Sequence, residues 1–258
     1  MMTTLRELYE YREMLFSMVK KDLRTRYRGS FLGFLWTFIN PLLQLVVYSI
    51  VFSTIMRMNI YNFAMFLFVA LLPWIFFSTS ITQSTTTIMA NSNLVKKIYF
   101  PRIILPISVA LTGFINMIFG FIIVFIVLFI FKIHLSSSIV LLPIVMINEL
   151  LFVVGLSIIF SALNVFFRDL EHILGIVTMA WFYLTPIVFP INLVPDKYLK
   201  LFFLNPMTSI ILPYRDILYY GLWPSKKSLL LIFLMGICFN VFAFILFDRL
   251  QRRFAEEI

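Results

Sequence analysis

The chain has 258 residues, of which 62% are hydrophobic and only 13% are charged. A soluble protein of this length could not bury so much apolar surface, so a lipid bilayer must be part of its solvent. The net charge of +9 would fit a nucleic-acid partner, but most basic residues lie at the ends of long apolar runs, where membrane topology explains them better, so we expect no nucleic-acid partner.

Residues 4–28 are the first element and are predicted to form an amphipathic helix. Apolar residues recur there at helical spacing, and the Glu, Lys and Arg residues lie off that stripe. A helix with one apolar stripe and a charged back lies along a membrane surface. On this pattern alone, a simple surface anchor for the first membrane span is the alternative.

Apolar runs predict an all-α polytopic membrane protein with six transmembrane helices in a single transmembrane domain over residues 1–258, since about 20 apolar residues cross a hydrocarbon core. The runs cover residues 34–56, 63–90, 103–131, 139–164, 172–190 and 228–247. An even number of spans places both termini on one side, together with 14 of the 21 Lys and Arg residues. Positive residues stay on the cytoplasmic side, so both termini are expected in the cytoplasm.

Polar and aromatic residues share one face in two of the spans. They are Asn40, Gln44 and Tyr48 in the first span, and Thr178, Trp181 and Thr185 in the fifth. Small and mildly polar residues also mediate helix packing, which is the alternative. We favour a substrate pathway here because rings beside amides and hydroxyls offer a sugar both flat apolar faces and hydrogen bonds.

The stretch 191–227, between the fifth and sixth spans, is apolar but broken by prolines into runs far shorter than a span. Short interfacial or re-entrant helices fit this pattern if protein covers their broken backbone. An ordinary solvated loop is the alternative.

The sequence contains no recognisable catalytic set. It has no phosphate-binding loop, no nucleophile elbow and no His and Cys spacing typical of a metal site. We therefore predict no catalytic residue, no metal and no cofactor bound by this chain. Glu149 is the one carboxylate within a predicted span, and a structural pair and a functional site are equally open for it.

Four stretches stand in an order and at a spacing that cover nearly the whole chain. They are RYRGSFLGFLWTFINPLLQLVVYSIVF (26–52), NSNLVKKIYFPRIILPIS (91–108), FRDLEHILGIVTMAWFYLTPIVFP (167–190) and NPMTSIILPYRDILYYG (205–221). Together they resemble the membrane subunit of a type-2 ATP-binding-cassette exporter. The resemblance is to the branch that exports lipid-linked polysaccharides, namely O-antigen, teichoic acid and capsule.

The resemblance implies that residues 91–102 form a cytoplasmic coupling helix that enters a groove on an ATPase. Its ridge would be Leu94, Val95, Ile98 and Tyr99, with Lys96 and Lys97 as the rim. The loop at Arg168 and Asp169 would be a second contact. On charge alone, 91–102 would be interpreted as an ordinary positive cytoplasmic loop.

The resemblance also implies the partners. Because this chain has no phosphate loop, ATP and Mg would be held by two copies of a separate nucleotide-binding ATPase subunit. A second copy of the chain would complete a homodimer in the cytoplasmic (inner) membrane of a bacterium, with a channel between the protomers. An undecaprenyl-type lipid-linked glycan would enter beside the helix at 4–28, among the membrane lipids.

On the same model, the region 191–227 forms an extracytoplasmic outer gate. Its basic residues Lys197, Lys200 and Arg215 would meet phosphate or uronate groups, or lipid headgroups. The expected function is a permease subunit for ATP-driven polysaccharide export, with O-antigen favoured. The alternatives are a type-2 exporter of drugs or small lipids, an ion-coupled flippase and, last, a membrane glycosyltransferase.

Overall fold

The computed structural model describes residues 2–25, 31–57, 60–130 and 136–257, and within these ranges the secondary structure is helical, without strands. The helices are α1 (Met2–Glu10), α2 (Arg12–Thr25), η1 (Gly33–Leu35), α3 (Trp36–Ser49), η2 (Ile50–Ile55), α4 (Phe63–Ala90), α5 (Ser92–Lys97), α6 (Ile104–Ile130), η3 (Ser137–Leu141), α7 (Leu142–Phe166), α8 (Leu170–Tyr183), η4 (Ile191–Leu193), α9 (Asp196–Leu204), α10 (Pro206–Leu218), α11 (Lys226–Leu250), η5 (Gln251–Arg253) and α12 (Phe254–Glu257). The predicted all-α class is confirmed.

Five helical segments are long and apolar enough to cross a membrane. They are Trp36–Ile55, Phe63–Ala90, Ile104–Ile126, Ser137–Phe166 and Lys226–Arg253. Each coincides with one of the predicted spans. The chain is thus built as a multi-pass membrane protein, in agreement with its apolar composition.

The remaining predicted span, 172–190, is not one continuous helix. Its helix α8 has 14 residues, or about 21 Å at the rise of an α-helix, which is less than the roughly 30 Å of a hydrocarbon core. The helix ends at Tyr183 and turns follow as far as residue 189. Pro186 explains the break, because proline lacks an N–H donor and the residue before it avoids helical dihedrals.

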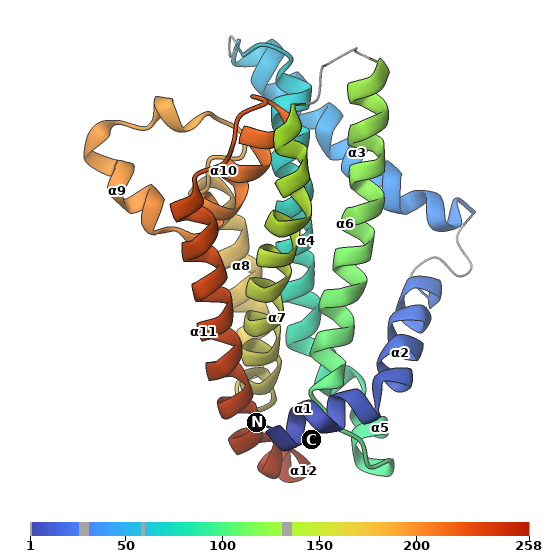
Figure 1. Ribbon diagram of the computed structural model, residues 1–258. Coiled ribbons are helices and arrows are strands. Elements are labelled where there is room, and N and C mark those ends of the chain that lie inside the picture. The colour runs from blue at the N-terminus through green and yellow to red at the C-terminus, as the bar shows by residue number, and fades with distance from the viewer. Residues whose placement is uncertain (1, 26–30, 58–59, 131–135, 258) are drawn as a thin grey trace.

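Helix α4 is the centre of the bundle (Figure 1). Of its most apolar stretch 78% is buried, against 6% for the stretch that contains α3. Long helices surround α4, and α7 and α11 pack closely side by side. Gly155 on α7 allows the close approach, since a β-carbon there would lie only 3.0 Å from Cβ of Phe239. In contrast, α3 crosses the bundle obliquely and leaves most of its surface uncovered.

Hydroxyls in the second half of α4 bond to the helix's own backbone. The hydroxyls of Thr79, Thr82 and Thr85 each donate to the carbonyl four residues earlier, at 2.6, 2.9 and 2.7 Å. This satisfies their donors without a partner from another helix, which allows a helix so rich in Thr to lie in a bundle core.

The predicted amphipathic helix at 4–28 is divided in two. Helices α1 and α2 meet at Tyr11; Arg26, Tyr27 and Arg28 lie outside the described residues. Figure 1 shows α1 across the lower end of the bundle and α2 rising beside α6, against which it packs. A single helix lying flat along one surface is therefore corrected to a bent pair, because α2 packs against α6.

Arg215 on α10 fastens the break after α8 to the centre of the bundle. Its guanidinium donates to the backbone carbonyls of Pro186 and Ile187 and, at 3.3 Å, to that of Phe189. Its Nε donates to the carbonyl of Phe66 on α4 at 3.4 Å, and Cζ lies 3.6 Å from the centroid of the Phe66 ring. The side chain is 1% exposed. These bonds satisfy carbonyls that the interrupted helix leaves without partners.

Replacing Arg215 with methionine is expected to lower the melting temperature of the purified protein by several degrees. The change leaves buried carbonyls unpaired, each at a cost of about 1–3 kcal/mol. Arg215→Lys is expected to fall between wild type and methionine, because an ammonium cannot reproduce the planar fork. Thermal unfolding in detergent measures this. Lys200→Met, at an exposed residue of α9, is the control. Equal melting temperatures of Lys200→Met and Arg215→Met would show that the hydrogen bonds of Arg215 contribute nothing to stability.

Candidate functional site

Two neighbouring cavities lie beneath α3 and form what we call the α3 groove. One, of about 330 Å³, is lined by Asn40 and Gln44 together with residues of α4 and α6. The other, of about 280 Å³, is lined by Gln44, Tyr48 and Thr178 together with further residues of α4 and α8. Gln44 and Thr79 line both cavities, so the two are adjacent. The groove thus gathers four of the six residues predicted for a substrate pathway.

Aromatic rings form one wall of the groove. The ring of Tyr48 stacks on that of Phe182, with centroids 5.5 Å apart and planes at 24°. The ring of Trp74 meets Phe182 edge-on at 5.7 Å, and both Trp74 and Phe182 line the second cavity. Hydroxyl and amide groups lie beside this wall, so the groove combines flat apolar surface with hydrogen-bonding groups. Sequence reasoning missed Trp74, although Trp74 and Ser78 are four residues apart on α4 and so lie on one helical face.

Trp181 and Thr185 do not line these cavities. The indole Nε1 of Trp181 donates to Oδ1 of Asn205 at 2.7 Å, and Nδ2 of Asn205 donates to the hydroxyl of Thr185 at 3.0 Å. The backbone N–H of Met207 also donates to Oδ1 of Asn205, which makes Asn205 the N-cap of α10. In this structure the two residues join the end of α8 to the start of α10.

Helix α5 and the two residues after it present only part of the predicted ridge to solvent. Ile98 is 56% and Tyr99 is 85% exposed, whereas Val95 is 5% exposed and belongs to the core. Leu94 is half-buried and packs on that core, and Lys96 and Lys97 are exposed. The expectation that Val95 contacts an ATPase is therefore corrected, because its side chain anchors α5 to the bundle.

The loop between α7 and α8 carries the other predicted contact. Arg168 and Asp169 are exposed there, beside a hollow of about 660 Å³ that Phe167, Ile173 and Glu257 also line. Phe167 is 67% exposed. The guanidinium of Arg168 donates to the backbone carbonyl of Glu257 at 3.4 Å. This corner combines an exposed ring with charges of both signs.

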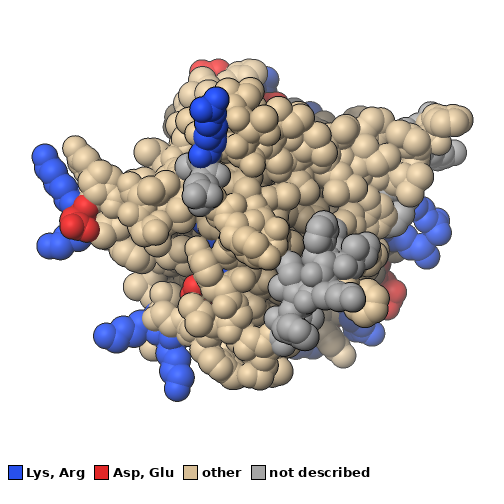
Figure 2. All heavy atoms as spheres, turned by 90° about the horizontal axis from the view of Figure 1, so that it is seen from above, with Lys and Arg blue, Asp and Glu red and all other residues tan. Residues whose placement is uncertain are grey.

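The predicted outer-gate residues separate into two groups. Lys197 and Lys200 are exposed on α9, which stands away from the bundle (Figure 1). Figure 2, which views this end of the molecule, shows Lys and Arg mainly at the edge of a largely uncharged face. Arg215 is buried, so the expectation that it meets phosphate groups or lipid headgroups is corrected by its bonds to backbone carbonyls.

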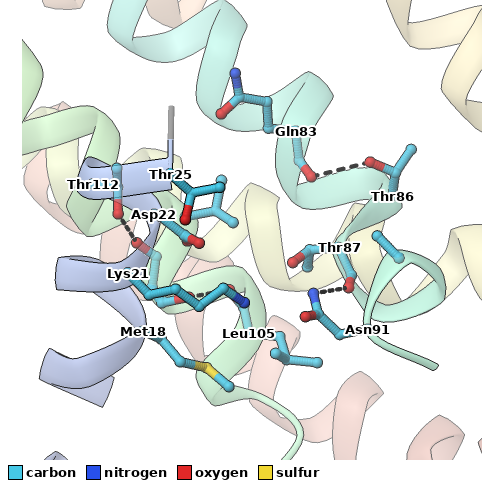
Figure 3. Close-up of a pocket in the computed structure, with 13 residues that line it drawn as sticks. Met18, Lys21, Asp22, Thr25, Gln83, Thr86, Thr87, Asn91, Leu105 and Thr112 are labelled. Atoms are coloured by element: carbon cyan, nitrogen blue, oxygen red, sulfur yellow. Dashed lines mark hydrogen bonds between the residues drawn. The ribbon is translucent and has the colours of Figure 1, made fainter. Parts of the chain in front are cut away.

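A polar pocket lies near the other end of the bundle, between α2, α4 and α6 (Figure 3). Its volume is about 340 Å³, and Lys21, Asp22, Gln83, Thr87 and Asn91 are among the residues that line it. Lys21 is exposed and has no ion-pair partner among the residues that the structure describes. Asn91 directly precedes α5, and its Nδ2 donates to the backbone carbonyl of Thr87 at 2.8 Å, so the pocket adjoins the segment that is predicted to couple to an ATPase.

Glu149 takes part in a buried pair. The hydroxyl of Tyr214 on α10 donates to Oε2 of Glu149 at 2.6 Å, and both side chains are inaccessible to solvent. The Tyr214 ring stacks on Phe121 of α6, with centroids 5.5 Å apart. Glu149 is not among the residues that line the α3 groove. The sequence left a structural pair and a functional site open for Glu149, and this geometry favours the structural pair.

Among the described residues there is no group of His, Cys, Asp and Glu that could hold a metal ion. The fold does bring together a polar and aromatic groove and, at the end that holds α5, a set of exposed residues that could contact a partner. This arrangement fits a binding surface and docking sites.

Known proteins of similar sequence agree with this picture. Residues 13–219 match the family model for the ABC-2 type transporter. The O-antigen export system permease protein RfbA of Myxococcus xanthus is 38% identical over 260 residues, covering 100% of both chains. RfbA of Klebsiella pneumoniae is 35% identical over 95% of this chain and 94% of its own. The polysialic acid transport protein KpsM of Escherichia coli is 24% identical over 74% of this chain and 75% of its own.

The family match covers most of the chain, and the two permeases exceed 30% identity along nearly their whole length. The family that the four sequence stretches resemble is thereby confirmed: the chain belongs to the membrane subunits of the ABC-2 type transporter family.

Proposed function

We propose that the chain is the permease subunit of an ATP-driven exporter that carries a lipid-linked O-antigen polysaccharide across the bacterial cytoplasmic membrane. The observation that carries the proposal is the α3 groove, with amide and hydroxyl groups beside stacked rings. Sugars present hydroxyls at their edges and apolar C–H faces, so this combination suits a glycan. The full-length similarity to permeases named for O-antigen export selects this cargo over drugs or small lipids.

The chain is proposed to cross the membrane six times. The position of α1 and α12 at the same end of the bundle (Figure 1) supports an even number of crossings. Five of the crossings are the long apolar helices. The sixth would consist of α8, the turns after it that Arg215 binds, and α10. Because most basic residues belong to the end that holds α1 and α12, this end is assigned to the cytoplasm. Helix α9, with exposed Leu201 and Leu204, would lie in the outer leaflet.

A second copy of the chain is proposed to cover α3. This helix exposes the apolar Leu43, Val46 and Val47 and also the polar Asn40 and Gln44. Amide groups facing lipid would lose hydrogen bonds to water without compensation. A homodimer that encloses a hydrated path along the α3 groove relieves that cost and gives a polymer room to pass.

The energy is proposed to come from two copies of an ATPase that hold ATP and Mg. The exposed Ile98 and Tyr99 at the end of α5, flanked by Lys96 and Lys97, have the apolar centre and charged rim of a docking site. Arg168 and Asp169 supply the second contact.

The cargo is proposed to arrive at the pocket of Figure 3. Lys21 offers an ammonium group among hydroxyls and amides, which suits the phosphate-bearing end of an undecaprenyl-type lipid-linked glycan. Helices α1 and α2 would form an interfacial collar around this entrance.

Gln44→Leu and Tyr48→Leu are expected to reduce glycan export and glycan-stimulated ATP hydrolysis several-fold each. Leucine keeps side-chain bulk but removes hydrogen-bonding groups, each worth about 1 kcal/mol. Surface glycan in cells and ATPase activity of the purified complex measure the effect. Ile126→Leu is the control, since Ile126 is 53% exposed on α6, outside both the groove and the face of α3 that the second copy is proposed to cover. Equal effects in all three variants would contradict the pathway.

Ile98→Asp and Tyr99→Asp are expected to abolish co-purification of the ATPase from detergent-solubilised membranes. Each puts a charge at the centre of the proposed docking site without disturbing a buried residue. Leu193→Asp, a residue of η4 that is 60% exposed, is expected to retain the ATPase. If wild type itself never retains an ATPase, the energy source lies elsewhere and an ion-coupled flippase becomes the better account.

A further inference from the structure

We propose that residues 251–257, the segment after α11, tie the two ATPase-facing corners of the permease into one mechanical unit. The first corner is α5 with Arg102, and the second is the α7–α8 loop with Phe166 and Arg168. The inference rests on the proposed function, because it assumes that an ATPase acts at these corners. In Figure 1 α12 lies beneath the bundle, at the end that holds α5.

The segment is bonded to the first corner through Arg102. This residue follows α5 closely in the chain, and its Nη1 donates to the backbone carbonyl of Gln251 at 2.6 Å. Its Cζ also lies 6.0 Å from the centroid of the Phe254 ring. The Gln251 carbonyl also accepts the backbone N–H of Phe254, and its second lone pair takes the charge-assisted bond from the guanidinium. Arg102 thus joins the coupling segment to the end of α11.

The segment is packed against the second corner through Phe254. Its side chain is completely buried, although it lies beyond the last long helix of the chain. The ring centroid lies 6.0 Å from that of Phe166, the last residue of α7, and 5.5 Å from that of Phe247 on α11. Arg168 donates to the carbonyl of Glu257 at 3.4 Å. The segment therefore contacts the residues that lead directly into α8.

These contacts make a continuous route from the coupling helix to the groove. A displacement of α5 moves Arg102, which holds Gln251; Phe254 presses on Phe166; and α8, which starts at Leu170, carries Thr178 into the α3 groove. Closely packed rings and charge-assisted bonds resist compression, so they transmit movement between elements. Gln251 and Phe254 are positioning residues on this route.

The test compares transported glycan with hydrolysed ATP in proteoliposomes that contain the permease, its co-purified ATPase and lipid-linked glycan. Phe254→Ala is expected to retain the ATPase but to lower the glycan moved per ATP several-fold. Phe68→Ala is the matched control, because Phe68 on α4 is equally buried, at 1% exposure, near the opposite end of the bundle. It is expected to leave the ratio unchanged.

A double-mutant cycle separates a shared route from two independent effects. Arg102→Gln, at a half-buried residue, removes the charge-assisted bond and is also expected to lower the ratio. The double variant with Phe254→Ala is expected to be no worse than the poorer single variant. The inference would be overturned if the double variant lost glycan moved per ATP by the product of the two single losses, or if Phe254→Ala left that ratio unchanged.

Two further outcomes are equally decisive. If Phe254→Ala does not accumulate in membranes, Arg102→Gln decides alone, and an unchanged ratio in that variant overturns the inference. If no ATPase co-purifies with the wild-type permease, the proposed function itself fails and the inference fails with it. A wild type that couples hydrolysis to export, beside variants that couple equally well, contradicts only the role of residues 251–257.

Discussion

The structure depends on one constraint: the hydrocarbon core of a bilayer offers no hydrogen-bond partner, so polar groups at that depth must find partners within the protein. Helix α4 meets the constraint locally, since its Thr hydroxyls bond to carbonyls four residues back. The turns after α8 leave backbone carbonyls without such local donors, and the side chain of Arg215 on α10 donates to the carbonyls of Pro186 and Ile187 there. Asn205 does the same for the end of α8 and the start of α10.

The same constraint makes α3 the exception that points to function. Its amides Asn40 and Gln44 are exposed, and only 6% of its most apolar stretch is buried. The amide groups of such a helix find hydrogen-bond partners only if water and protein cover them in the assembled transporter. Our proposals of a second copy and of a hydroxyl-rich polymer in the groove beneath α3 both rest on that one uncovered face.

Much of this architecture was predictable from the sequence, because apolar length and charge placement are local properties. The positions of the five long helices and of α5 follow from them. Burial was not predictable in the same way. The fifth span was predicted as one transmembrane helix although Pro186 lies within it, and only tertiary contacts reveal that Arg215 pairs the carbonyls at the break. For the same reason Val95 was assigned to a docking ridge, although its side chain faces the core, and Trp181 to a groove that it does not line.

The central claim is that the polar stripe of α3 faces a water-filled path, and thiol accessibility in native membranes tests it most directly. Single cysteines at Gln44 and Val47, in a chain whose exposed Cys238 is replaced by serine, would be exposed to a charged, membrane-impermeant maleimide. The account predicts that the cysteine at position 44 reacts and that the one at position 47 does not. Equal reactivity at both positions, or none at position 44, would contradict a hydrated path along α3.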